Sequence, residues 1–265
     1  MKIAFWSPIP GQSGTTSNLL ASAVMSSVIL KKSIFILHNH FSDYSLEKAV
    51  IGKNAGPELF EDIGLDSLLR NIKIPDLSES TIDDSVISLF NNRLHMLPGT
   101  AKEYRDQFES EMPERIPAIV NSVNQYYDLV FMDLVPGYGI QSQILLENAD
   151  LIVVNLTQDV NSIDNYFAKY DFPKEKVVYL IGRYNKNSRY NINNLERSYH
   201  SIRHKTAVIP YNVEFMDSVL DGKLIPYIIK NHAGGREEDN LYFIKKLKQA
   251  VGLIWDCLMR AGEIN

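Results

Sequence analysis

The chain has 265 residues, of which 45% are hydrophobic and 22% charged, a composition typical of a globular α/β protein with a substantial core. The formal net charge of -5 gives no overall reason to expect a nucleic-acid-binding protein, although it leaves room for a local basic patch. The single cysteine, Cys257, excludes an internal disulfide and a cysteine-based zinc cluster and fits a reducing compartment. Because the sequence has no signal-peptide pattern and no membrane-spanning apolar run, we expect a cytoplasmic protein.

Short apolar runs alternate with longer helical patterns along the chain. Runs this continuous are typical of strands buried on both faces, so the pattern predicts a doubly wound, mostly parallel twisted sheet with helices on both faces, an α/β fold. The predicted strands are residues 2–6, 33–37, 93–97, 129–133, 151–156, 176–182 and 206–210, and helices are predicted at 16–30, 112–126, 193–200 and 241–259. Without an internal repeat or long linker, residues 1–265 are predicted to form one domain. Residues 41–92 are the least regular, and we expect small helices with mobile connections there.

The first predicted turn has the outline of a phosphate-binding loop. Its residues are Gly11, Gln12, Ser13 and Gly14, and the following helix opens with Thr15, Thr16 and Ser17. Glycines let successive backbone N–H groups point inward, and a helix N-terminus adds its positive dipole end, so the main chain can hold phosphate. In the usual loop a lysine follows the second glycine and a Ser or Thr then binds Mg²⁺. Here Thr15 takes the lysine position and Thr16 the metal position, and a plain turn whose Ser and Thr cap the helix remains the alternative.

A second segment, "YYDLVFMDLVPGYG", places Asp133 at the end of a predicted buried strand. At that edge of a parallel sheet, a carboxylate points into the same crevice as the loop and can orient a Mg²⁺-bound water. An aspartate that only caps a loop is the alternative. Together with the glycine loop, Asp133 favours a site for phosphate and Mg²⁺, with Thr16 and Asp133 on the metal side.

These segments, in this order, resemble the ParA/MinD family of deviant Walker ATPases. The resemblance runs over nearly the whole chain, through "GQSGTTSNLLA", "IFILHNHF", "GLDSLLRNI", "RLHMLPGT", "YDLVFMDLVPGYG", "ADLIVVNLTQD" and "AVIPYNVEFMDSVLDGK". Within the family, the loop with a small residue in place of lysine is most similar to the TadZ/CpaE branch. That branch is associated with the assembly and positioning of Flp-type pili and related secretion machines.

The resemblance implies a P-loop NTPase-like fold that binds ATP or ADP with Mg²⁺. It also implies a homodimer that pairs across the nucleotide crevice and protein partners in a pilus or secretion apparatus, with no DNA expected. Base contacts are implied at the ends of two strands, at Arg183, Tyr184, Pro210 and Tyr211. Gly182 stands where the family usually has an asparagine, and either Tyr184 or Tyr211 is a candidate to stack on a purine.

Several positions depart from the family pattern. The signature lysine, which in the family reaches the partner's nucleotide, falls at Pro10, and Thr15 replaces the second lysine. A hydrogen bond to a charged group contributes about 1.5 to 3 kcal/mol, so each loss is expected to weaken triphosphate binding roughly tenfold to a hundredfold. His38 and His40 replace the aspartates that position the attacking water. We therefore expect slow hydrolysis or none, and no catalytic residue is assigned.

The "HNH" run at residues 38–40 also suggests a metal site or nuclease. We disfavour a metal site because the two histidines are expected to point to opposite sides and no His or Cys cluster follows. His40 as a substitute switch residue near phosphate is a better interpretation, and a partly exposed histidine at a strand end is the simplest one.

The last predicted helix carries an apolar stripe formed by Phe243, Leu247, Val251, Ile254 and Leu258. Some relatives use such a helix for peripheral membrane contact, but packing against the sheet is the favoured interpretation.

Three functions remain open from the sequence. The favoured one is a dimerising scaffold that uses ATP as a structural ligand to localise a pilus or secretion apparatus. The alternatives are an active partitioning ATPase and a nucleotide-free pseudo-ATPase that acts through protein contacts.

Overall fold

The computed structural model describes residues 1–60, 62–71 and 77–262. An eight-stranded sheet with the order β3-β4-β2-β5-β1-β6-β7-β8 forms its centre. Every neighbouring pair of strands is parallel except β3 and β4, which are antiparallel. The strands are β1 Lys2–Trp6, β2 Ile34–His38, β3 Ile87–Phe90, β4 Leu94–Met96, β5 Leu129–Asp133, β6 Leu151–Leu156, β7 Val177–Tyr184 and β8 Thr206–Pro210. The predicted α/β fold is confirmed.

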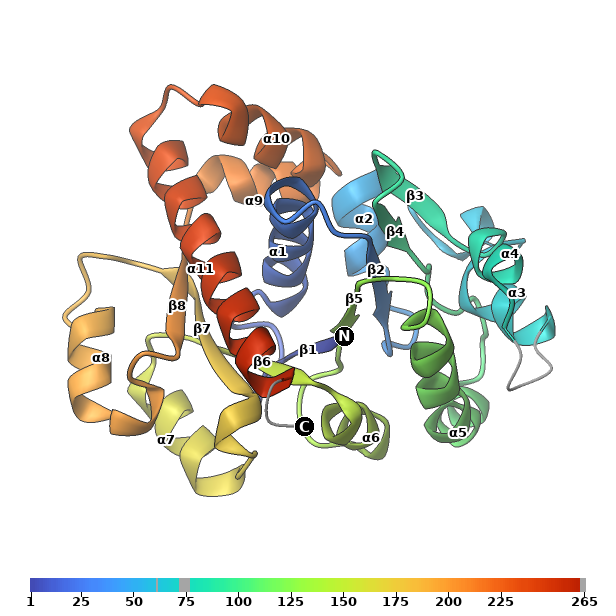
Figure 1. Ribbon diagram of the computed structural model, residues 1–265, viewed down its shortest axis with the longest axis horizontal. Helices are drawn as coiled ribbons and strands as arrows, with labels where there is room; N and C mark the ends of the chain where they lie inside the picture. Colours follow the sequence, from blue (N-terminus) through green and yellow to red (C-terminus); the bar gives the residue numbers. More distant parts are fainter. Residues whose placement is uncertain (61, 72–76, 263–265) are drawn as a thin grey trace.

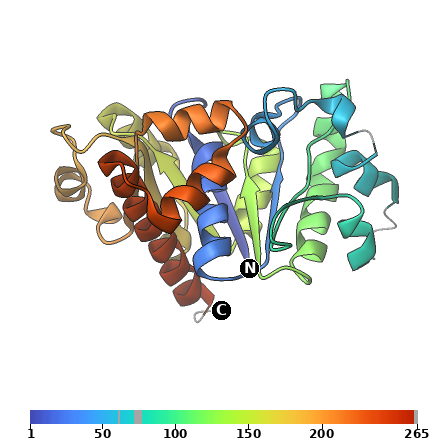
Figure 2. The same ribbon diagram turned by 90° about the horizontal axis from the view of Figure 1, so that it is seen from above.

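Two layers of helices cover the sheet (Figures 1 and 2). Alternate residues of β1 show why both faces are buried: Ile3 and Phe5 join one apolar cluster, whereas Ala4 and Trp6 join the other. The first cluster packs against α1 Thr15–Ile29, α2 Ser45–Ile51, α9 Val213–Leu220, α10 Leu224–Gly234 and α11 Glu238–Gly262. The second packs against α3 Gly64–Asn71, α4 Glu79–Asp83, α5 Arg105–Val123, α6 Ile140–Asn148, α7 Val160–Lys169 and α8 Ile192–Ser198.

The predicted strands match the sheet, but several helix predictions were wrong or missing. Helix α5 begins at Arg105 rather than at residue 112, and it carries Pro113 and Pro117 in its interior. The sequence did not predict α6, α7, α9 or α10, nor the edge strand β3. That strand lies in the irregular segment 41–92, of which residues 61 and 72–76 are outside the described residues, as is the last residue of "GLDSLLRNI".

Helix α11 packs as the favoured interpretation expected. All members of its apolar stripe are at most 5% exposed and belong to the cluster on the α1 side of the sheet. The stripe is therefore part of the core, and the packing prediction is confirmed. Within the described residues, no helix has the length and hydropathy required for a membrane span.

Strand β1 lies inside the sheet between β5 and β6, with β2 beyond β5. Asp133 at the end of β5 is in register with Phe5 of β1 on one side and with His38 of β2 on the other. The carboxyl ends of these three strands therefore meet at one edge, which is where open α/β sheets bind ligands.

Candidate functional site

The loop between β1 and α1 has the backbone of a phosphate cradle. Gly11 and Gly14 adopt left-handed conformations, with φ of 73° and 68°. Gly14 is the N-cap of α1, no side chain caps this helix, and its first turn holds no acidic residue. The first N–H groups of α1 thus have no side-chain acceptor, which leaves the positive end of the helix free for an anion.

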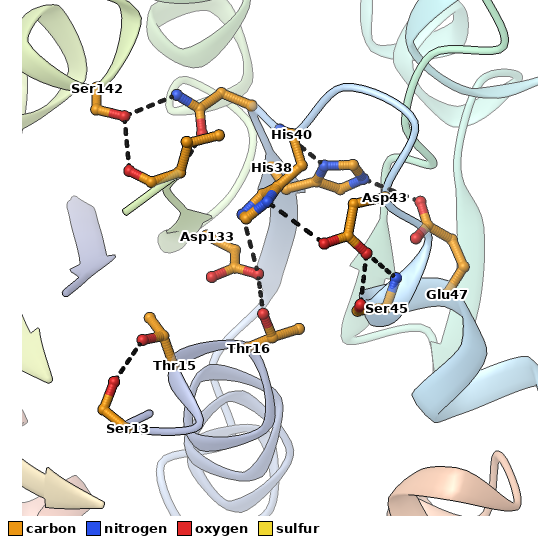
Figure 3. A network of polar contacts seen from close by, with 12 residues as sticks. Ser13, Thr15, Thr16, His38, His40, Asp43, Ser45, Glu47, Asp133 and Ser142 are labelled. Atoms are coloured by element: carbon orange, nitrogen blue, oxygen red, sulfur yellow. Dashed lines mark hydrogen bonds and ion pairs between the residues drawn. The ribbon is translucent and has the colours of Figure 1, made fainter. Parts of the chain in front are cut away.

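The hydroxyl groups of the loop do not cap the helix, so the capping interpretation of the sequence was wrong. Ser17 Oγ donates to the Gly14 carbonyl oxygen at 3.0 Å, and Ser13 Oγ and Thr15 Oγ1 share a hydrogen bond of the same length. Thr16 Oγ1 points across to the end of β5 (Figure 3). The hydroxyls therefore brace the loop and reach toward Asp133 instead of occupying the helix N–H groups.

Strand β7 supports the loop from the side, and only glycine fits at the contact. A Cβ atom on Gly182 would lie 1.9 Å from the Ser13 carbonyl oxygen and 2.8 Å from Asn18 Nδ2. Asn18 Nδ2 donates to that same carbonyl and to Asn155 Oδ1, each at 3.0 Å. The replacement of the family asparagine by Gly182 thus has a physical reason, because the phosphate loop rests directly on the β7 backbone.

Asp133 is a buried carboxylate, 1% exposed, that faces the start of α1. Thr16 Oγ1 donates to its Oδ2 at 2.7 Å, and His40 Nε2 lies 3.6 Å from the same oxygen (Figure 3). Oδ1 is buried without a hydrogen-bond partner among the described residues. Burial raises the pKa of Asp133 above its ordinary value, although His40 and the Thr16 hydroxyl act in the opposite direction. Oδ1 of Asp133 can therefore accept a further hydrogen bond, for example from a metal-bound water.

His38 and His40 lie together, so the expectation that they point to opposite sides was wrong. Their ring centroids are 5.5 Å apart, because side chains two residues apart in extended backbone share a face. The His40 backbone N–H donates to His38 Nδ1 at 3.2 Å, which leaves Nε2 to donate to Glu47 Oε1 at 3.0 Å. His38 is therefore a buried structural residue, whereas His40, two residues past the end of β2, is partly exposed, as the simplest interpretation expected.

Glu47, on α2, fixes His38 from beneath. Its Oε1 also accepts the Gly99 backbone N–H at 2.8 Å. Burial alone would raise the pKa of Glu47, but the His38 ring and this N–H hold the pKa below its ordinary value of 4.5. No sequence pattern predicts this contact, because α2 and the Gly99 turn meet only in the folded chain.

The His40 ring lies close to Asp133 and also to a second carboxylate, that of Asp43. Asp43 Oδ2 lies 3.8 Å from His40 Nδ1, and Ser45 donates to the Asp43 carboxylate through its N–H and its hydroxyl (Figure 3). Burial lowers the pKa of His40, partly opposed by Asp133, so the ring is held toward its neutral form at neutral pH. No carboxylate was expected in the segment after β2, but the structure places Asp43 of the adjoining loop beside His40.

A second missed feature joins this switch to the loop after β5. Asn39 Oδ1 accepts the Val135 N–H at 2.7 Å, and Asn39 Nδ2 donates to Ser142 Oγ at 3.2 Å. Ser142 Oγ donates in turn to the Val135 carbonyl oxygen at 2.9 Å. Trp6 Nε1 holds the same loop by donating to the Gly137 carbonyl oxygen at 2.6 Å. The segment after β2 and the loop after β5 are therefore joined directly by hydrogen bonds.

The hydroxyl of Thr16 and the carboxylate of Asp133 are the kinds of oxygen ligand that Mg²⁺ binds. Within residues 1–60, 62–71 and 77–262, no group of three or more His, Cys, Asp or Glu is arranged to hold a metal ion. Mg²⁺ commonly uses one or two protein ligands together with phosphate and water, a set that the Thr16 hydroxyl and the free Asp133 Oδ1 match. The space that Thr16, His40, Asp43 and Asp133 enclose is too tight for a water molecule. Entry of a hydrated ion therefore requires His40 or Asp43 to move.

The residues expected on the base side differ in availability. Tyr211, which follows Pro210 at the end of β8, is 58% exposed, and its N–H donates to the Tyr184 carbonyl oxygen at 3.0 Å. Tyr184 is only 5% exposed, and its hydroxyl accepts the Ile192 N–H at 3.2 Å. The Tyr184 ring belongs to the core, so Tyr211 is the tyrosine of this pair that is free to contact a base. Arg183 is exposed beside the phosphate loop.

Comparison with solved structures identifies the class of fold. A ParA family ATPase from Chlorobium tepidum is 17% identical, covers 94% of this chain and 98% of its own, and has a TM-score of 0.70. The septum site-determining protein MinD of Pyrococcus horikoshii, complexed with Mg-ADP, is 15% identical over 94% of this chain and 96% of its own, with a TM-score of 0.66. A plasmid partition protein of Borrelia burgdorferi bound to AMPPNP is 16% identical over 96% and 98%, with a TM-score of 0.61.

The chain therefore has the fold of the ParA/MinD ATPases. Its glycine loop and Asp133 lie at the carboxyl edge of the sheet. No protein-family model and no curated protein sequence matches the chain, so the likeness to the solved structures is one of fold.

We predict that Glu47→Gln destabilises the protein by about 1.5 to 3 kcal/mol at pH 7, because a charged acceptor of two buried hydrogen bonds is lost. The folded-state pKa of Glu47 is lowered, so its contribution is present above 4.5 and is lost as the pH falls through that lowered pKa. Urea unfolding at several pH values should show the difference from wild type shrinking below pH 4.5. Glu58→Gln, at an exposed position, is the control; equal effects of the two variants would contradict the prediction.

Proposed function

We propose that this protein binds ATP or ADP with Mg²⁺ at residues 11–17. One observation carries the proposal: the uncapped N-terminus of α1 lies next to a buried carboxylate that has a free oxygen. Main-chain N–H groups and the helix dipole would hold the phosphates, Thr16 would bind the metal ion, and Asp133 would orient its water. When bound, Mg²⁺ neutralises phosphate charge. Two structural neighbours were solved with Mg-ADP and with AMPPNP bound, which supports a nucleotide as the ligand.

We further propose that the bound nucleotide serves a structural purpose in a homodimeric scaffold. The scaffold would localise or assemble a Flp-type pilus or a secretion apparatus in the cytoplasm through protein partners. The support is the resemblance of the loop, with Thr15 in place of lysine, to the TadZ/CpaE branch. An active partitioning ATPase and a nucleotide-free pseudo-ATPase are the outcomes that the experiments below separate from it.

Slow hydrolysis is part of the proposal. Phosphoryl transfer depends on positive charge near the phosphates and on a group that positions water. Here the Thr15 hydroxyl is bonded to Ser13, and neutral His40 fills the space beside Asp133. A site with these groups retains the means to bind phosphate but lacks most of the means to stabilise the transition state.

Mg-ATP is expected to bind the wild-type protein, and Gly14→Val is expected to abolish binding. Gly14 has a φ of 68°, and a Cβ there would meet Ser17 Oγ at 3.1 Å, so valine distorts the cradle at the helix start. Isothermal calorimetry measures the affinity. Gly252→Ala is the control, because a Cβ at this position in α11 meets nothing within 4 Å. Unchanged affinity in Gly14→Val would show that Mg-ATP does not bind at this loop. Absence of binding by the wild-type protein would favour the pseudo-ATPase.

Phosphate release by the purified protein with Mg-ATP should stay far below the ~1 to 100 s⁻¹ typical of kinases. Thr15→Lys should raise the rate, since it returns a cation to the phosphates, whereas Thr15→Ser, which keeps the hydroxyl, should leave it unchanged. A wild-type rate within the kinase range would instead support the active partitioning ATPase.

Sedimentation should reveal a two-fold dimer whose interface includes the nucleotide edge. Without a lysine at Pro10, Mg-ATP should strengthen the dimer less than in a typical relative, because a ligand shifts assembly only by its differential affinity for the two states. Ile140→Glu, at the exposed start of α6 beside the switch loop, should weaken the dimer. Met259→Glu, exposed near the end of α11, is the control. A strict monomer at tens of micromolar, with and without Mg-ATP, would overturn the dimer proposal.

A further inference from the structure

Arg183 adopts a backbone conformation that is unfavourable for its residue type. Its φ is 49°, in the left-handed region where a non-glycine residue carries a steric cost. It lies where the pairing of β7 with β8 shifts register, between Ile181 and Tyr184. The irregularity turns Arg183 out to solvent while Gly182 and Tyr184 on either side stay buried. Strain of this kind persists where the surrounding structure imposes it, and it is concentrated at functional sites.

The surroundings of Arg183 direct its side chain over the phosphate loop. Because Gly182 lies directly against the Ser13 carbonyl, the Arg183 backbone starts immediately beside the loop. The Nε atom of Arg183 is 3.9 Å from the position that a Cβ on Gly14 would occupy, and Ser17 Oγ is 3.1 Å from the same point. The guanidinium group therefore lies beside the N-cap of α1, where an anion would be held.

Among the described residues, no acidic side chain is paired with this guanidinium. The first turn of α1 contains no acidic residue, and no hydrogen bond or ion pair joins the Arg183 side chain to another part of the described chain. Arg189, six residues further on, differs in this respect, because its guanidinium packs on the Tyr190 ring and donates to the Tyr190 hydroxyl at 2.7 Å. Arg183 thus has its donors available at the positive end of a helix.

We propose that Arg183 binds the nucleotide phosphates and supplies, from β7, the positive charge that the loop lacks at Pro10 and Thr15. The inference rests on the proposed function and makes it more specific. A guanidinium carries five donors in a planar fork that suits phosphate oxygens and stays charged at every physiological pH. Its position beside Gly14 favours phosphate contact over the base contact implied by the family resemblance, since Tyr211 at the end of β8 is the exposed group on the base side.

Arg183→Gly tests this role without adding backbone strain, because glycine accepts a left-handed φ without steric cost. Lys31→Gly is the matched control. Lys31 also has a positive φ, 55°, and is also an exposed cation, but it follows the far end of α1. The helix separates the two positions by roughly 22 Å at 1.5 Å per residue. Both variants remove one positive charge and relieve one strained backbone conformation. Only Arg183→Gly removes a cation that lies beside the loop.

Calorimetry with Mg-ATP and Mg-ITP, whose bases differ at the 6-position, separates the contacts. We expect Arg183→Gly to weaken both nucleotides by the same factor, about tenfold to a hundredfold, with an unreduced melting temperature, and Lys31→Gly to leave both affinities unchanged. Arg183→Asn, which also tolerates a left-handed backbone, should reproduce the loss.

Three results would overturn the inference. Unchanged ATP affinity in both Arg183 variants would remove Arg183 from the site and leave the proposed function intact. A loss of affinity that alters the ratio of ATP to ITP binding would place Arg183 at the base. Absence of nucleotide binding by the wild-type protein would overturn the proposed function and this inference together.

Discussion

The site is organised around a carboxylate buried where three parallel strands end. Asp133 is held between the ends of β1 and β2 by the register of the sheet, and it is only 1% exposed. A buried carboxylate is costly unless polar groups surround it, and the structure provides Thr16 on one side and His40 on the other. These groups satisfy only one of its oxygens. Oδ1 remains able to accept a hydrogen bond from a ligand, which distinguishes this candidate binding site from a strand end that is only packed.

The glycine loop after β1 is held in place by contacts with β7 and β6. Gly182 allows β7 to touch the loop at Ser13, and Asn18 ties the same carbonyl to β6 through Asn155. Such close support orders the loop N–H groups before any ligand arrives, which lowers the entropic cost of binding an anion there.

The two switch segments are joined by hydrogen bonds to buried groups. Asn39 connects the segment after β2 to Val135 and Ser142, and Trp6 anchors Gly137 from the end of β1. The His38–Glu47 pair fixes the first switch to α2 below it. The segment after β2 and the loop after β5 are therefore connected to each other and to the buried core.

The sequence by itself determined the layered α/β fold, the glycine loop and the position of Asp133 at a strand end. These features follow from local rules: apolar runs predict buried strands, and parallel strands carry ligands at their carboxyl ends. Only the tertiary structure decided the partners of the histidines, the arrival of Asp43 beside His40, the burial of Tyr184 and the position of Arg183 over the loop. Each depends on a contact between segments distant in sequence or on a local register shift, which hydrophobic periodicity does not encode.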